Sequence, residues 1–530
     1  MAEGEEQKSM LYKLKPVTDR LPAVVRPEGH VHFRTKMMWV ILILVLYFAM
    51  TNIVIYGLDT GTGVDLFAQY RAILAGAQFS LMHLGIGPIV TGSIIMQLFV
   101  GAKIIKLNLK DDEDKAVYQG TQKLLVLIMI VVEAAPQVYG FMEPSEKFTL
   151  NMEGLWEGQG VNLARTMIVV QLFLGSYIVF LMDEVVSKWG IGSGVSLFIA
   201  AGVAQQIFTG TFNWHGSNYP DLPVNDYDNP PAGTIPKTIY LFHHMSASEL
   251  ANGGGLEKII LQQPNPMVAL LGTAVIFLIV AYTESSRIEL PLAHGGARGA
   301  RGRYPIKLIY ASNIPVILMA ALLANVSMFS LLFYSNPGFQ DVPLLGSNWA
   351  LGYYDPTGTE TRAEGGLAYY LSTINGLNDW LLPLLSDGYL GQYYAQDKTK
   401  IQIGIHVLAY VGIMIAGSVM FARFWIETTN MGPEAVATQI ESSGMQIPGF
   451  RRDPRVLKRV LERYIPVVTI ISGAVVGALA AGADLIGTVG NASGTGVLLA
   501  VGIMIQLYDA IGREQMMEMH PVLRGFFGGD

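Results

Sequence analysis

The sequence predicts an all-α membrane protein with ten transmembrane helices, and three observations support this fold class. The chain has 530 residues, of which 51% are hydrophobic and only 15% charged, whereas soluble globular domains carry about 25% charged residues. The mean hydropathy is +0.39. The apolar residues also gather in runs near the length of about 20 residues that a helix needs to cross a bilayer. These features together indicate a polytopic membrane protein.

A window of about 19 residues finds the ten candidate spans in order along the chain. They cover residues 36–57, 84–102, 121–141, 164–183, 193–211, 266–283, 308–331, 403–425, 465–485 and 493–512. Most of the 35 Lys and Arg residues then fall on the same side of the membrane as the N-terminus. Because cytoplasmic loops are enriched in these residues, we expect a multi-pass protein of the cell membrane with both termini in the cytoplasm.

The second span is broken at its start. It opens with Gly85, Gly87 and Pro88, and it follows a stretch, 65–82, that is too polar to face lipid and too short to span alone. Irregular backbone at membrane depth is tolerated only where it is buried in protein or lines a watery cavity. The broken span therefore predicts that the chain surrounds a path through the membrane.

The spans divide into two groups of five. An N-terminal half over 35–211 and a C-terminal half over 266–512 would have opposite orientations, as in inverted-repeat membrane proteins, although the sequence shows no visible similarity between the halves. The remaining segments are an interfacial helix within 1–34, long outer connections at 212–265 and 332–402, and a cytoplasmic tail at 513–530.

Signatures of enzymes and of metal sites are missing from the sequence. The glycine-rich runs at 190–196 and 490–496 lack the Lys-Ser/Thr pair of a phosphate-binding loop, and no His-Glu-x-x-His pattern occurs. His243 and His244 are adjacent, which places them on different faces of a helix and disfavours a metal site. The chain has no cysteine. We therefore expect no catalytic residue, no metal and no cofactor.

Glu133 is the one carboxylate at the centre of a predicted span, because Asp183 and Glu184 lie at the end of theirs. An intramembrane carboxylate is costly and usually functional. Two interpretations stay open from the residues alone, a packing group bonded to neighbouring hydroxyls and amides, or a gating group.

Two cytoplasmic loops are rich in arginine. Residues 284–308 place Arg301 and Arg303 beside a glycine-rich tip between two short alternating stretches, which predicts a projecting hairpin. The loop at 427–464 ends in a basic amphipathic segment that begins near Arg451 and Arg452, with an apolar face formed by Val456, Leu457, Val460, Leu461 and Tyr464. The charges either fix the topology alone or dock the chain to an anionic partner.

Six motifs in sequence order are similar to those of one known family. They are LGIGPIVTGSIIMQL, DEVVSKWGIGSGVSLFIAAGVAQ, YPIKLIYASNIPVILMAALLANV, FWIETT, GFRRDP and GTGVLLAVGI. Together they resemble SecY, the family of channel subunits of the Sec protein translocon, in its archaeal form. The likeness runs from about Leu11 to Pro521, and the long outer loops depart from it.

The resemblance implies a central hourglass pore with a re-entrant plug helix at 64–80, between two inverted halves. It implies a pore constriction of aliphatic residues at Ile86, Val90, Val195, Ile199, Ile317 and Leu499. It also implies a lateral gate between the second and third spans and the seventh and eighth, with Thr91, Glu133 and Asn325 at its polar seam.

The resemblance further implies a passive channel for secretion across the membrane and for lateral insertion into it. Its expected partners are a SecE-like γ subunit and a small β subunit, membrane lipids, signal sequences and nascent polypeptides, and the ribosome. The ribosomal RNA contacts would be Arg301, Arg303, Arg451 and Arg452. The alternative function is a secondary transporter of a small solute, since broken helices also occur there. The aliphatic ring, without an ionisable group at mid-membrane, favours the channel.

Overall fold

The structure is a computed structural model. It describes residues 10–29, 31–59, 71–101, 104–105, 107, 111–140, 142–217, 224, 229–294, 301–307, 309–311, 313–335, 351–354, 363–385, 398–429, 431–442, 445–446, 454–490 and 492–519.

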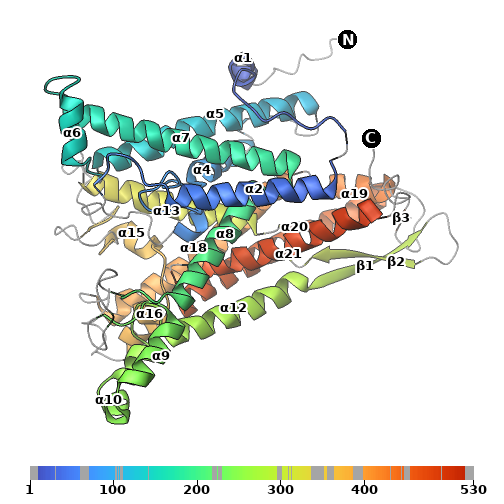
Figure 1. Ribbon diagram of the computed structural model, residues 1–530. Helices are drawn as coiled ribbons and strands as arrows, with labels where there is room; N and C mark the ends of the chain where they lie inside the picture. Colours follow the sequence, from blue (N-terminus) through green and yellow to red (C-terminus); the bar gives the residue numbers. More distant parts are fainter. Residues whose placement is uncertain are drawn as a thin grey trace.

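Long helices lie side by side and form the body of the molecule (Figure 1). Within the described residues, nine helices are long and apolar enough to cross a membrane. They are α2 (Phe33–Asn52), α5 (Asp112–Gly140), α7 (Gly160–Trp189), α8 (Gly194–Phe212), α12 (Met267–Ser285), α13 (Ile314–Ser335), α18 (Lys400–Thr428), α20 (Pro454–Ile486) and α21 (Gly494–Met519). Each matches one of the predicted spans.

The tenth predicted span is the shorter helix α4 (Gly87–Gly101). It begins late because the chain turns just before it. Gly85 has a φ of +56°, and a Cβ there would lie 2.1 Å from the carbonyl oxygen of Leu74, so only glycine fits. The backbone N–H of Ile86 donates to that same carbonyl at 2.8 Å. The break in the second span is therefore real and tightly packed.

The end of the first span was predicted wrongly. The sequence suggested residue 57, but α2 ends at Asn52. The next residues extend and pair with the segment before α4, since Ile55 N–H donates to the Phe79 carbonyl and Leu81 N–H to the Ile53 carbonyl. Of this extended stretch Ile55 is buried at 2% exposure, whereas Ile53, Val54 and Tyr56 are exposed.

One end of the bundle carries a β-hairpin, as predicted (Figure 1). Strand β1 (Arg287–His294) pairs antiparallel with β2 (Arg301–Lys307), and β3 (Met445–Gln446) adds to the free edge of β1. The helix α19 (Pro433–Ser442), which no sequence pattern predicted, packs beside them through Ala437 and Ile440 against Leu461 of α20. We call this end of the bundle the hairpin end.

The opposite end, which we call the cap end, carries the short helices of the long connections. They are α6 (Glu146–Glu153), α9 (Thr234–His244), α10 (Ala247–Asn252), α11 (Gly255–Ile260), α15 (Gly366–Leu371) and α16 (Leu377–Leu385). Tyr354 and Tyr369 of the later connection are buried against Leu331 near the end of α13. That connection therefore has a small core of its own.

The N-terminal segment lies along the hairpin end. It forms a short helical stretch from η1 (Met10–Leu14) through α1 (Lys15–Thr18), followed by extended chain up to α2. Thr18 is buried at Gly120 of α5, where a side chain would lie 2.8 Å from its hydroxyl oxygen. The rest of the predicted interfacial segment within 19–29 is not helical.

Candidate functional site

A polar seam joins α4, α5 and α13 inside the bundle. The Thr91 hydroxyl of α4 donates to Glu133 Oε1 of α5 at 2.9 Å. Asn325 Nδ2 of α13 donates to the Thr91 oxygen at 2.9 Å. Glu133 is 2% exposed and Thr91 9%. The three residues named from the sequence therefore meet in one hydrogen-bonded cluster, and Thr91 is the hydroxyl partner of Glu133.

The six aliphatic residues named for the constriction come from four helices and one turn. Ile86 precedes α4, Val90 lies on α4, Val195 and Ile199 on α8, Ile317 on α13 and Leu499 on α21. All are buried except Val195, which is half-buried and packs against the same apolar core. No ionisable residue is among them, so the set offers a passing polar group no hydrogen bond.

The described part of the predicted plug is the segment 71–80, which includes the single turn α3 (Arg71–Leu74). Residues 64–70 lie outside the described residues. Leu74 packs against Ala324 and Met328 of α13, and the Tyr47 hydroxyl of α2 donates to the Ala75 carbonyl at 3.3 Å. This segment therefore contacts both halves of the chain.

Two aspartates to which the sequence assigned no role cap the first turns of α8 and α21: Asp183 on α7, which is half-buried, and Asp484 on α20, which is buried. Asp183 Oδ1 accepts the Val195 N–H at the start of α8, and Asp484 Oδ1 accepts the Thr495 N–H at the start of α21, each at 2.9 Å. The first junction lies at the hairpin end and the second at the cap end. The two halves thus repeat one junction in opposite directions.

A sequence signal for this repeat was available. The runs GIGSGVSLFI and GNASGTGVLL begin at Gly190 and Gly490, and both place Ser-Gly four residues in and a ring residue, Ile199 or Leu499, at their end. The glycine of each pair is required, because a Cβ at Gly194 would lie 2.5 Å from Asp183 Cα and one at Gly494 only 2.0 Å from the Ala483 carbonyl carbon. The glycine-rich runs are helix junctions.

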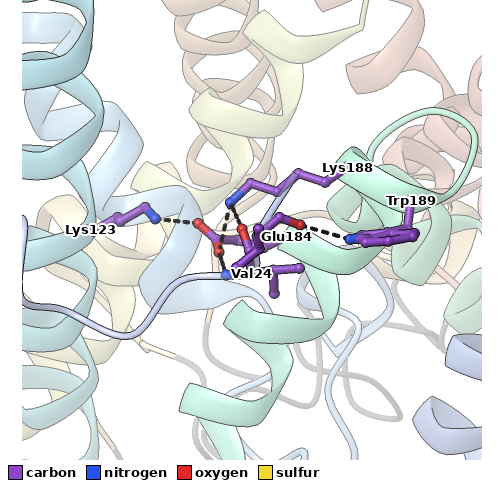
Figure 2. A network of polar contacts seen from close by, with 6 residues as sticks. Val24, Lys123, Glu184, Lys188 and Trp189 are labelled. Carbon is purple, nitrogen blue, oxygen red and sulfur yellow. Dashed lines mark hydrogen bonds and ion pairs between the residues drawn. The ribbon is translucent and has the colours of Figure 1, made fainter. Parts of the chain in front are cut away.

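The hairpin end holds an ionic network that fastens the N-terminal segment (Figure 2). Glu184 of α7 forms ion pairs with Lys123 of α5 and, at 3.2 Å, with Lys188. Its Oε2 also accepts the Val24 N–H at 2.8 Å, and Lys188 donates to the Val24 carbonyl at 2.6 Å. Trp189 Nε1 donates to the Val25 carbonyl at 2.8 Å. We call this set the N-terminal strap.

Two of the four arginines named for docking lie on a described element. Arg301 and Arg303 are in β2, opposite Ala293 and Pro291 of β1. Arg451 and Arg452 lie outside the described residues. Of the apolar face predicted over 456–464, Leu461 is buried, but Tyr464 is 49% exposed, because α20 continues without a break into its apolar half.

No cluster of three His, Asp or Glu side chains suited to a metal occurs in the part of the chain that the structure describes. His243 and His244 lie at the end of α9 with their rings 84° apart. A cavity of about 310 Å³ opens at the cap end between α12, α16 and the α20–α21 junction, lined by residues such as Asn265, Asn375 and Thr488. It is remote from the polar seam.

Comparisons with known proteins agree with these features. The family model for SecY matches residues 80–508, and a model for the plug domain of Sec61p matches residues 45–78. The protein translocase subunit SecY of Archaeoglobus fulgidus is 44% identical over 521 residues, covering 98% of this chain and 99% of its own. That of Haloferax volcanii is 45% identical over 518 residues, covering 97% and 99%.

Solved structures resemble the chain as closely. A protein-conducting channel superposes with a TM-score of 0.73 at 36% identity, covering 96% of this chain and 98% of the other. Sec61 in a canine ribosome-channel complex from the endoplasmic reticulum superposes with a TM-score of 0.70 at 36% identity and the same coverage.

Proposed function

The chain belongs to the SecY family, and from that premise we propose how its residues build the channel. It is a multi-pass membrane protein and a protein-conducting channel subunit of the Sec translocon. The alternative of a small-solute transporter has no support in these similarities.

The six aliphatic residues form the constriction of the pore. They come from α8, α13, α21, α4 and the turn before α4, all belong to one apolar core, and none is ionisable. A narrow apolar constriction blocks ions by dewetting. It also offers no hydrogen bonds that would hold a passing polypeptide. The same ring can therefore seal the resting channel and let a chain slide.

The polar seam is the lateral gate. It is held by Thr91, Glu133 and Asn325, and buried polar contacts between membrane helices contribute only about 0.6 kcal/mol each. An apolar segment gains about 0.3–0.6 kcal/mol per Leu-like residue on entering lipid, whereas a central Asp or Lys costs about 2.5–3.5 kcal/mol. The seam therefore opens for signal sequences and membrane spans and stays closed to polar chain.

The single observation that carries this function is the hydrogen-bonded path from Asn325 through Thr91 to Glu133 across three helices. Cysteines at Thr91 and Asn325 test it, because the chain has no competing cysteine. We expect an oxidised disulfide to form and to block export of a secretory substrate in proteoliposomes, with recovery on reduction. Undiminished export with the disulfide formed would contradict the gate.

The ring is tested by ion conductance. Replacing Ile86, Val90 and Ile317 together with Ser should make planar bilayers leak ions, since a hydroxyl-lined constriction stays wet. The matched control replaces Leu271, Val275 and Leu278 with Ser on the outward face of α12, where all three are exposed. Equal conductance in both triple variants would remove the ring assignment.

The hairpin end faces the cytoplasm and docks the ribosome through Arg301, Arg303, Arg451 and Arg452. The excess of Lys and Arg on this side supports the orientation, and the canine relative forms a ribosome-channel complex. Replacing Arg301 and Arg303 with Glu should weaken ribosome co-sedimentation and flatten its salt dependence, whereas Arg513→Glu near the end of α21 should do neither.

A SecE-like γ subunit and a small β subunit complete the complex, and the chain itself catalyses no reaction.

A further inference from the structure

A second set of polar side chains continues from the gate seam toward the plug. Gln137 lies one turn beyond Glu133 on α5, and its Nε2 donates to the Glu133 carbonyl at 2.9 Å. Its Oε1 lies 3.0 Å from His83 Nε2, in the turn that precedes α4. Gln137 is 1% exposed and His83 3%. The two side chains therefore form one buried contact between α5 and the turn before α4.

The hydrogen bonds of His83 determine which nitrogen of its imidazole carries the proton. His83 Nδ1 accepts the Phe79 N–H at 3.1 Å, so Nδ1 carries no proton. The proton therefore lies on Nε2, which donates to Gln137 Oε1. The ring also stacks on Phe79, with the two planes 4° apart. A neutral His83 thus joins the backbone of the plug segment to the side chain of α5.

Arg71 completes the set from within the plug segment. Its Nη1 donates to the His83 carbonyl at 2.8 Å, and the residue is only 6% exposed. Through Arg71 the described turn α3 is bonded to the residue that contacts α5. Breaking the bond between Arg71 and the His83 carbonyl would leave a buried guanidinium short of an acceptor, which costs free energy. This cost keeps Arg71 bonded to His83 while the plug segment is seated.

The plug segment consequently has supports on both sides of the seam. On the α5 side the support is polar, through His83 and Gln137, although Gln137 Nε2 also donates to Met328 Sδ of α13 at 3.8 Å. On the α13 side it is apolar, through Leu74 against Ala324 and Met328. When α5 and α13 separate, the segment can follow only one of them. Opening the seam must therefore break one support.

We propose that Arg71, His83 and Gln137 form a latch that seats the plug against α5, so that movement of α5 at the gate releases the plug. These are positioning residues, since none contacts the passing chain. The proposal rests on the proposed gate. Loss of the latch should free the plug while the gate stays closed.

The test follows plug release and gate closure separately in the full chain, in proteoliposomes. A single cysteine at Ile73, which is 2% exposed, reports release by its labelling rate with a water-soluble maleimide. The variants are Gln137→Met and His83→Phe, which keep approximate size but remove the hydrogen bond. We expect each to raise the labelling rate about tenfold, and their combination to add nothing to either alone.

The matched control is Gln122→Met, another glutamine of α5 that bonds to α4, through Ser93 Oγ at 2.7 Å. It should leave the labelling rate at the parent value. The disulfide between cysteines at Thr91 and Asn325, measured in separate chains, should form as readily in the latch variants as in the parent.

Each outcome separates the latch from the gate. Parental labelling rates in both latch variants would overturn the latch, as would purely additive effects. Faster labelling together with a lost gate disulfide would mean that the residues hold the seam instead, which also overturns it. Failure of the disulfide in the parent itself would overturn the gate, while labelling would still report whether the three residues seat the plug.

Discussion

At the residue scale, the two aspartate junctions show how the bundle positions two helices that carry residues of the proposed ring. The first N–H groups of a helix lack intrahelical acceptors, and inside a membrane no water replaces them. At the start of α21, Asp484 accepts the Thr495 N–H. It also accepts hydrogen bonds from the hydroxyls of Thr495 and Tyr410, at 2.6 Å each. Because Leu499 follows one turn later, the carboxylate fixes the height of a ring residue.

We therefore expect Asp484→Ala to destabilise the chain more than Asp484→Asn. Alanine leaves three buried donors without an acceptor, at about 1–3 kcal/mol each, whereas the asparagine amide oxygen keeps part of the set. Thermal unfolding in detergent measures the difference. Asp509→Ala, near the other end of α21, is the control. Equal melting temperatures for Asp484→Ala and Asp509→Ala would contradict the role of the cap.

Lys237 of α9 gives a pH prediction outside the membrane spans. It is 1% exposed, and its Nζ donates to the carbonyls of Gln262 and Pro264 at 3.0 and 2.6 Å. Burial lowers the pKa of Lys237 from 10.5 to about 8. Between these values the unfolded chain holds a proton that the folded chain has lost, so the free energy of unfolding rises as pH rises through this window.

The expected gain is up to about 3 kcal/mol, and it should be absent below pH 8. Melting temperatures at about pH 7 and about pH 9.5 measure it. Because other groups also titrate, the comparison is with Lys237→Met, which should lose this part of the pH dependence. The same pH dependence in the parent and the variant would show that Lys237 does not contribute.

The residues of the site differ in how far the sequence could identify them. Thr91 and Asn325 stand within motifs that resemble a known family, and Glu133 is the one carboxylate at the centre of a predicted span, so their meeting could be predicted. His83 and Gln137 are 54 positions apart, and each alone is an ordinary polar residue near an apolar run. Their pairing depends on how the turn before α4 packs against α5, which no local pattern contains.

At the scale of elements, the sequence located the helices better than their ends. The apolar window placed the ninth span at 465–485 and treated the basic stretch before it as separate, whereas α20 is one helix of 33 residues. That is about 50 Å long, against a hydrocarbon core of about 30 Å. Hydropathy marks where a helix meets lipid, and a helix that projects into water keeps the same backbone hydrogen bonds.

The root of the hairpin joins three elements at one close contact. Asn313 Nδ2, just before α13, donates to Glu284 Oε1 of α12 at 2.8 Å, and both residues are buried. Gly502 of α21 faces them, and a Cβ there would lie 1.8 Å from Asn313 Nδ2 and 2.7 Å from Glu284 Oε1. The arms of the hairpin are thus fixed to the helices that carry Ile317 and Leu499.

Gly502→Ala should push Asn313 from Glu284 and destabilise the chain by about 1–3 kcal/mol, measured as a lower melting temperature. Gly412→Ala on α18 is the control, because nothing lies within 4 Å of its added Cβ. There alanine should be neutral or stabilising by up to about 1 kcal/mol, since glycine is the poorer helix former. A Gly502→Ala variant as stable as Gly412→Ala would show that the contact relaxes freely.

At the scale of the whole molecule, the fastenings on the two sides of the pore differ in kind. The proposed gate is held by hydrogen bonds between Asn325, Thr91 and Glu133, with no ion pair among the three. At the hairpin end, Lys36 of α2 pairs with Glu514 of α21 at 2.8 Å, which joins the first helix to the last. Within the N-terminal half, the N-terminal strap ties α5 to α7 through Lys123 and Glu184. When the seam opens, α5 should therefore move together with α7.

The N-terminal strap should fail when Glu184 is removed. Glu184→Ala leaves Lys123, Lys188 and the Val24 N–H without their shared acceptor, so the extended segment should detach from α7. Trypsin cleavage after Arg20, just before the strapped residues Val24 and Val25, measures detachment; Arg26 is followed by Pro27, so trypsin does not cleave there. We expect cleavage to become about tenfold faster, because losing about 1.4 kcal/mol of the free energy of local opening raises the opened fraction about tenfold. Glu514→Ala removes the ion pair with Lys36 at the same end of the bundle and should leave the cleavage rate after Arg20 unchanged. Equal cleavage rates in the two variants would contradict the strap.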